Sequence, residues 1–237
     1  MNHQRRTNNI MGSVFGKETV AEPAYDVLLQ RSAGHGVETS YEIRKYGERF
    51  AAEVEYSEDE GTGDPFRALA RYIGVFGTPE NEGNQAISMT APVVMEKSPT
   101  KIAMTAPVVM EKSNEKEGEK TMKFILPKEF DDMSKIPKPT NPDVHIEEIP
   151  AQLGVVHRFS GSMSETTNRE KSAELASQLS SDGLERMTVD YVMDHYQFWG
   201  YNPPFTLPMF RRNELWVELS EAEAKMLMDK FDPSTAN

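Results

Sequence analysis

The sequence contains no cysteine, and this absence excludes several kinds of chemistry. Without thiols the chain can form no disulfide, offers no thiolate nucleophile and cannot ligate a metal or haem iron through cysteine sulfur. No apolar run approaches the roughly 20 residues that a membrane-spanning helix needs. The first ten residues are polar and basic, without the apolar centre of a secretory signal or the look of a long transit peptide. We therefore expect no membrane span and a cytoplasmic location, with the chloroplast as the alternative.

Basic residues are outnumbered by acidic ones, 26 against 38, and the chain carries a net charge of −12. A phosphate backbone would be repelled by such a protein, which argues against nucleic-acid binding. Nucleophile elbows, HExxH, Walker loops and dinucleotide fingerprints are all missing, so we expect no enzymatic activity. The length of 237 residues, with 38% hydrophobic residues, fits one globular domain, which we expect to be a monomer.

The clearest candidate for a binding surface is a helix that the pattern predicts from Asp64 to about Val75. Asp64 provides a capping side chain, and Pro65 suits the first turn. The apolar stripe of this helix consists of Phe66, Leu69, Ala70 and Ile73. Arg67 and Arg71 flank the stripe. An apolar wall edged by arginine suits a flat macrocycle with two carboxylates, whereas the same pattern also fits an ordinary amphipathic helix packed on a core.

A twelve-residue segment occurs twice, fifteen residues apart. Residues 87–98 and 102–113 are identical at eleven positions and differ only at Ser88 and Ala103. Two copies of so short a period do not make a repeat fold. Each copy is apolar and β-branched with one proline, which is typical of edge or bulged strands. We expect one copy to complete the fold and the other to form a hairpin arm beside it, within 87–113.

The rest of the pattern predicts an α+β fold. Strands are expected at 39–54, 122–126, 144–146, 154–159, 189–199 and 214–219, and further helices at 164–179 and 220–231. Each half of this order places one helix against antiparallel strands, which indicates an internal two-fold. We divide the chain into a flexible extension at 1–13, one domain at 14–219, and a C-terminal helix and tail at 220–237.

Histidine and methionine are the remaining candidates for iron ligands. His157 and His195 each share a predicted strand face with apolar residues, where a histidine is more often structural than a ligand. Most of the 14 methionines are expected to pack, although one could ligate haem iron. We assign no metal site and no catalytic residue.

Several stretches, taken together and in order, resemble the SOUL/haem-binding-protein family from about Val14 to Leu219. They are Tyr41–Tyr46, Arg71–Asn81, Ile102–Val108, Met122–Pro127, Phe159–Gly161, Tyr201–Pro208 and Arg211–Trp216. The duplicated MTAPV segment and the opening GSVFGK look most like the plant and green-algal cytosolic branch of that family.

The resemblance implies a distorted antiparallel β-barrel of two βαββ-like halves with two packed helices. It also implies haem or another porphyrin, held reversibly in a shallow apolar cleft beside the first helix. The family's pocket positions on that helix match Phe66 and Ala70, with Arg71 as the basic neighbour. The closing loop brings Arg212 near the same cleft, and Thr206 stands where some members have a lysine.

One position departs from the family pattern. Some members have a histidine, proposed as an axial ligand, where this chain has Lys45, and a protonated lysine is a poor ligand. We therefore expect a tetrapyrrole carrier or buffer that binds by apolar burial, without a strong axial ligand. The alternative is a protein-interaction module that has kept the fold and lost the ligand, with the duplicated arm as its contact surface.

Overall fold

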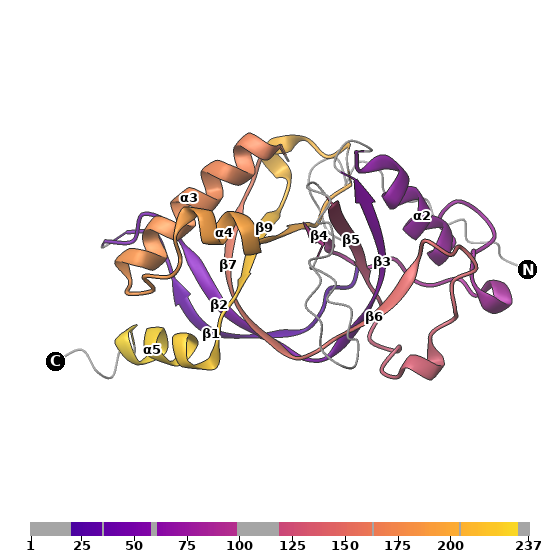
Figure 1. Cartoon of the computed structure of the whole chain (residues 1–237), viewed down its shortest axis with the longest axis horizontal. Coiled ribbons are helices and arrows are strands. Elements are labelled where there is room, and N and C mark those ends of the chain that lie inside the picture. Colours follow the sequence, from indigo (N-terminus) through magenta and orange to yellow (C-terminus); the bar gives the residue numbers. More distant parts are fainter. Residues whose placement is uncertain are drawn as a thin grey trace, which may run out of the picture.

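The computed structural model describes residues 20–34, 36–57, 61–98, 119–162, 164–203 and 205–231. Its strands form a single antiparallel sheet in the order β1-β2-β7-β9-β8-β4-β5-β3-β6 (Figure 1). The strands are β1 (Tyr25–Arg31), β2 (Tyr41–Tyr46), β3 (Arg49–Ser57), β4 (Val93–Lys97), β5 (Glu119–Ile125), β6 (His145–Ile149), β7 (Gln152–Phe159), β8 (Gln197–Gly200) and β9 (Asn213–Glu218). Within the described residues β1 and β6 are the two edges and do not pair, so the expected closed barrel is not confirmed.

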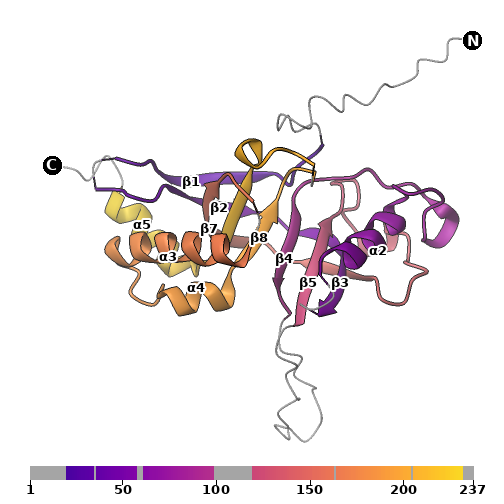
Figure 2. The same cartoon turned by 90° about the horizontal axis from the view of Figure 1, so that it is seen from above.

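Helices cover the two halves of this sheet separately. In the described part of the chain they are α2 (Gly63–Ile73), α3 (Glu165–Ser181), α4 (Val189–His195) and α5 (Glu221–Phe231). Figure 2 shows α2 beside β3 and β5, and α3, α4 and α5 beside the other half. Reading outward from the β4–β8 contact, the three innermost strands of each half follow the same relative order along the chain, β4-β5-β3 and β8-β9-β7, whereas the outer strands do not. The predicted α+β class is thereby confirmed. No helix of the described ranges is long and apolar enough to span a bilayer.

Strand alternation gives the sheet two different faces. In β2, Ile43 points to the helix-covered side and joins the core under α3, whereas Tyr46 points to the opposite side. There Tyr46 packs edge-on against Trp199, which stacks in parallel on Trp216. We call this opposite side the helix-free face. Arg44 lies on the helix-free face together with Tyr46, so this face combines buried aromatic rings with a buried charge.

One predicted strand is wrong. The segment expected as a strand at 189–199 begins instead with the helix α4, and only its last residues form β8. The side chain of Thr188 accepts a hydrogen bond from the backbone N–H of Tyr191 and so caps the helix. Val192 is fully buried in the core under α3. Capping and tertiary packing outweigh the β-propensity of the valines and the tyrosine.

The first helix begins one residue before its predicted start at Asp64 and ends before its predicted end at about Val75. It runs over Gly63–Ile73 and stops because Gly74 adopts φ 89°, a left-handed conformation that favours glycine. Asp64 is not the cap; it lies in the first turn and pairs with Arg67 at 2.6 Å.

The first copy of the duplicated segment supplies β4, which lies between β5 and β8. Val94 is buried there, and Glu96 lies opposite Gln197 of β8 and Thr121 of β5. The second copy, at 102–113, and the predicted extension at 1–13 lie outside the described residues.

Candidate functional site

The apolar stripe predicted on the first helix faces the sheet. Leu69, Ala70 and Ile73 expose between 0 and 3% of their surface and belong to the core formed with β3 and β5. Phe66 is half-buried and packs edge-on against Phe124 at a centroid distance of 5.4 Å. These side chains therefore contact protein on the side where the sequence predicts a ligand.

The two arginines of that helix are exposed. Arg67 pairs with Asp64, while the side chain of Arg71 makes no hydrogen bond or ion pair within the described residues. Thr206 and Arg212 lie in the other half, in the segment that joins β8 to β9, and both are buried. The structure thus separates the predicted set into a group on α2 and a group between β8 and β9.

A pocket of about 720 Å³ opens beside the β8–β9 segment. The end of the β1–β2 hairpin, the end of β7 and the 3₁₀ turn Pro208–Phe210 form its walls. Its lining includes five arginines and several apolar side chains: Arg31, Arg44, Arg158, Arg211 and Arg212, with Val156, Phe159, Met209 and Phe210. Its volume lies within the range typical of sites for small organic ligands. Of the predicted residues, Arg212 lines this pocket.

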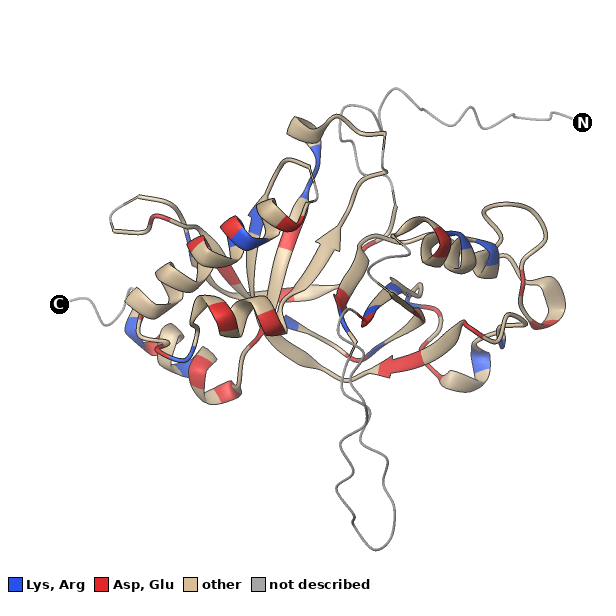
Figure 3. Ribbon diagram, turned by 45° about the horizontal axis from the view of Figure 1, so that its top comes forward, with Lys and Arg blue, Asp and Glu red and all other residues tan. Residues whose placement is uncertain are grey.

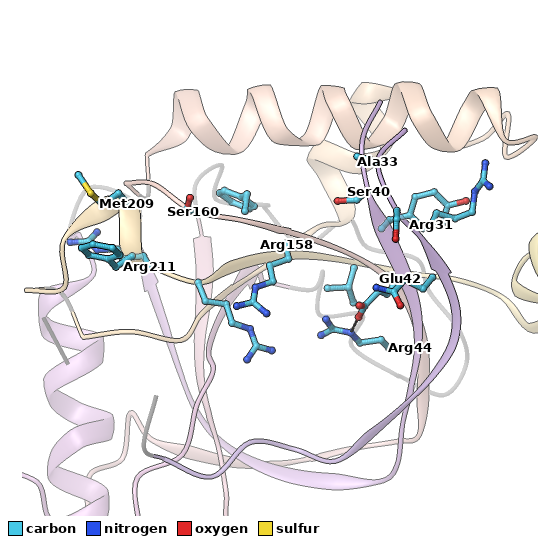
Figure 4. Close-up of a pocket in the computed structure, with 16 residues that line it drawn as sticks. Arg31, Ala33, Ser40, Glu42, Arg44, Arg158, Ser160, Met209 and Arg211 are labelled. Atoms are coloured by element: carbon cyan, nitrogen blue, oxygen red, sulfur yellow. Dashed lines mark hydrogen bonds and ion pairs between the residues drawn. The ribbon is translucent and has the colours of Figure 1, made fainter. Parts of the chain in front are cut away.

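The arginines of this pocket differ in their availability to a ligand. Figure 4 shows Arg158 and Arg44 pointing into the space between the strands, while Arg31 points away from it. Arg31 pairs with Asp182 at 3.3 Å and lies over the ring of Phe231. Arg158 is exposed, and its side chain has no hydrogen-bond or ion-pair partner in the part of the chain that the structure describes. Arg158 can therefore meet an anionic group without breaking an existing pair.

A buried charge network forms the floor beside Arg158. Glu214 is fully buried and accepts hydrogen bonds from Arg44 at 2.8 Å, from Arg212 at 2.9 Å and from the Tyr201 hydroxyl at 2.8 Å. Arg212 also donates to Glu22 at 2.9 Å. One carboxylate thus holds two guanidinium groups in fixed positions at the pocket wall.

The network perturbs the groups within it. Burial would lower the pKa of Arg44, but the adjacent Glu214 carboxylate outweighs burial, so the pKa of Arg44 is raised. Burial, together with the charge of Glu214, raises the pKa of Tyr201 far above its ordinary value. Both arginine and tyrosine therefore keep their protons at physiological pH, and the phenol remains a hydrogen-bond donor.

Sequence reasoning missed Arg44, Arg158 and Glu214 as members of one site. A signal exists for Glu214, because it is a charged residue directly before the apolar run Leu215-Trp216-Val217. A buried charge in a strand requires a partner. Which partner it finds depends on the order β2-β7-β9, and the sequence does not reveal that order.

Of the residues considered as iron ligands, Met209 is part of this lining, whereas Lys45, His157 and His195 are not. Lys45 is exposed on β2, on the strand side opposite Arg44. His157 is buried; its Nδ1 lies 2.7 Å from the Ser40 carbonyl, and burial lowers its pKa. His195 is exposed on α4 and stacks on Tyr191.

Comparison with known proteins identifies the family. Residues 20–100 and 96–218 match the family model described as "SOUL heme-binding protein", a description that names haem binding and no catalysis. The chain is 28% identical to "Heme-binding protein 1" of Xenopus tropicalis, over 88% of this chain and 94% of that protein. It is 31% identical to "Heme-binding protein 2" of Homo sapiens, over 75% of this chain and 77% of that protein.

Likeness to solved structures is more distant. The crystal structure of the EcmrR C-terminal domain gives a TM-score of 0.48 at 12% identity, covering 77% of this chain and 98% of that chain. A likeness so remote bears on neither fold nor function. The family match, in contrast, extends over most of the sequence, and the chain therefore belongs to the SOUL heme-binding protein family.

Proposed function

We propose that the protein binds haem or a related tetrapyrrole reversibly and acts as a carrier or buffer. The family and the names of both relatives support the ligand class. The observation that carries the proposal is the pocket beside the β8–β9 segment, which combines five arginines with apolar walls. This combination suits a ligand that pairs a flat apolar ring with carboxylate groups.

The residues of the pocket fit such a ligand. Phe210 is 43% exposed and offers apolar surface to the ring, whereas Val156 and Phe159 are buried with 2% and 9% exposed. Arg158 offers an unpaired guanidinium to a propionate. Arg44 and Arg212 also line the pocket, but both are already paired with carboxylates, those of Glu42, Glu214 and Glu22. Burial of a few hundred Å² of macrocycle at about 25 cal/mol per Å² would supply several kcal/mol before association costs. We expect binding in the micromolar range or tighter.

Iron ligation contributes little in this proposal. The pocket lining contains no histidine among the described residues, and Met209 is its only sulfur-bearing side chain there. When bound, haem would supply iron chemistry, but the chain's own residues hold the ring by contact and charge. We therefore propose that metal-free porphyrin binds about as well as haem does.

Two alternatives give different results in the same experiment. The ligand could bind instead along the outer side of α2, beside Phe66, Arg67 and Arg71, as the family resemblance implies. Ring contact there with Leu69, Ala70 and Ile73 would require α2 to move, because these three side chains are buried. A protein-interaction module without ligand remains the functional alternative.

The test is an absorbance titration of the full chain with hemin, repeated on Arg158→Glu and Arg71→Glu. These variants form a matched pair, because both arginines are exposed and neither side chain has a partner within the described residues. A charge-assisted hydrogen bond contributes about 1.5–3 kcal/mol, so Arg158→Glu should raise the Kd more than about tenfold. Arg71→Glu should leave the Kd within about twofold of the parent.

Each other outcome has a distinct meaning. If Arg71→Glu weakens binding and Arg158→Glu does not, the ligand lies at α2. If the unmodified chain shows no saturable change in the Soret band below about tens of micromolar hemin, the carrier function is wrong.

Finer statements belong to the same proposal. Membership of the plant and green-algal branch rests on the duplicated MTAPV segment and the opening residues. A cytoplasmic location and a monomeric state are proposed from the sequence alone. A protein contact through the duplicated segment is a separate proposal, since that segment lies largely outside the described residues.

A further inference from the structure

The segment between β8 and β9 exposes several large apolar side chains close together. Phe205 is 60% exposed, Leu207 43% and Met209 71%. Figure 3 shows the 3₁₀ turn of this segment projecting beyond the sheet and the helices of its half. A patch of this kind on a charged protein needs an explanation, because isolated exposed apolar residues are common but clustered ones mark contact surfaces.

The segment is held in this shape by its own hydrogen bonds. The backbone N–H of Gly161 donates to the Pro208 carbonyl at 2.9 Å, and that of Arg211 donates to the same carbonyl at 3.1 Å. The Arg211 guanidinium donates to the Thr206 carbonyl at 2.8 Å. Thr206 is buried while the apolar residues on either side of it point outward. The turn therefore presents Phe205, Leu207 and Met209 on a fixed base.

The two chain stretches that form this turn and its base lack acidic residues, although the chain as a whole carries 38 of them and Glu22 reaches Arg212 from elsewhere. Residues 195–213 contain no Asp or Glu, and neither do residues 150–164. These two stretches meet where Gly161 hydrogen-bonds to the Pro208 and Asn213 region. The charged side chains they contribute include Arg158 and Arg211. The apolar turn therefore lies beside the arginines Arg158 and Arg211, in a protein whose net charge is −12.

We propose that this turn is a docking surface for an anionic lipid bilayer. Phe205, Leu207 and Met209 would enter the boundary between headgroups and acyl chains, and Arg158 and Arg211 would meet lipid phosphates. The turn presents apolar side chains at its tip and arginines behind them. A bilayer of anionic lipids is apolar in its interior and negatively charged at its surface, so the two surfaces are complementary. The net negative charge of the rest of the molecule orients it with this turn toward the lipid.

The inference does not rest on tetrapyrrole binding, although both use Arg158, and its test uses no haem. The full chain is sedimented with vesicles of phosphatidylcholine alone, and with vesicles that contain about 30% phosphatidylserine. We expect binding to the anionic vesicles, weakened by added salt, and at least about tenfold weaker binding to neutral ones. The double variant Leu207→Ser/Met209→Ser should lower binding to anionic vesicles at least tenfold.

A matched control removes apolar surface elsewhere. Val75 and Phe76, which follow α2, are 48% and 61% exposed, so Val75→Ser/Phe76→Ser removes a similar amount of exposed apolar surface. This control should bind like the parent. Circular dichroism of both double variants should match that of the parent, since all four side chains are exposed.

Three results would overturn the proposal. They are the absence of binding to anionic vesicles, equal losses in the two double variants, and equal binding to neutral and anionic vesicles. If circular dichroism shows that the turn variant is misfolded, the single variant Met209→Asp serves in its place. Retention of full vesicle binding by Met209→Asp would also overturn the proposal.

Discussion

The buried carboxylate of Glu214 is expected to be a main support of the pocket wall, and Glu214→Gln tests this. Its two oxygens accept bonds from Arg44, Arg212 and Tyr201, and none of its surface is exposed. The substitution keeps the size of the side chain, removes its charge and leaves two guanidinium groups underpaired. Breaking a buried ion pair in this way typically costs about 3–5 kcal/mol.

The expected loss lies near the lower end of that range. Arg44 keeps Glu42 at 2.7 Å, and Arg212 keeps Glu22 at 2.9 Å, so neither guanidinium is left without a carboxylate. We expect the free energy of unfolding to fall by about 3 kcal/mol, a large part of the stability of an ordinary domain. Urea denaturation followed by circular dichroism measures this directly.

The control is Glu218→Gln, which removes a carboxylate from the exposed end of the same strand. It should change the free energy of unfolding by less than about 0.5 kcal/mol. A loss below about 1 kcal/mol for Glu214→Gln would refute the reasoning, because it would place the two arginines in a solvated setting.

Three further predictions follow from the sheet. Gly154→Ala should destabilise the fold by about 1–3 kcal/mol, because an added Cβ would lie 2.2 Å from the Trp216 ring, and Gly47→Ala, in open space, is the control in urea denaturation. Burial lowers the pKa of His157 in the folded state, so the unfolded chain binds more protons below its ordinary value of about 6.5. The free energy of unfolding of the parent should therefore fall as the pH is lowered from about 7.5 to about 5.5, and it should fall by more than that of His157→Gln. An equal fall in the two proteins would contradict this. Deleting residues 98–112 should keep β4 and shorten the β4–β5 connection from about 20 to about 6 residues. The shorter connection should raise the free energy of unfolding by about 1 kcal/mol, measured by thermal denaturation. A deletion variant that shows no cooperative unfolding transition would show that the second copy is required.

Much of the fold follows from local pattern. The helix at 63–73 and the helix that begins after Ser164 are predicted because apolar spacing and end signals agree there. The side chain of Ser164 does accept the backbone N–H of Thr167, as a cap should. The segment at 189–195 is mispredicted because its β-branched residues favour a strand, whereas the Thr188 cap and the packing of Val192 under α3 select the helix.

The candidate site is less predictable, for a physical reason. An apolar stripe shows which side of a helix is buried, but it does not distinguish burial against protein from burial against a ligand. On α2 the stripe packs on β3 and β5. The arginine-lined pocket arises from β2, β7 and the β8–β9 segment, which are more than 100 residues apart at their extremes and are adjacent only through strand pairing. Arg212 was found because family resemblance, and not periodicity, pointed to it.

The most direct test of the central claim is one absorbance titration of the full chain, with hemin and with metal-free protoporphyrin IX in parallel. Binding by apolar burial and arginine contact predicts that both ligands saturate in the micromolar range, with Kd values within about tenfold of each other. Saturation by hemin alone would show that iron ligation holds the ligand. A chain that saturates with neither ligand below about tens of micromolar would contradict tetrapyrrole binding itself.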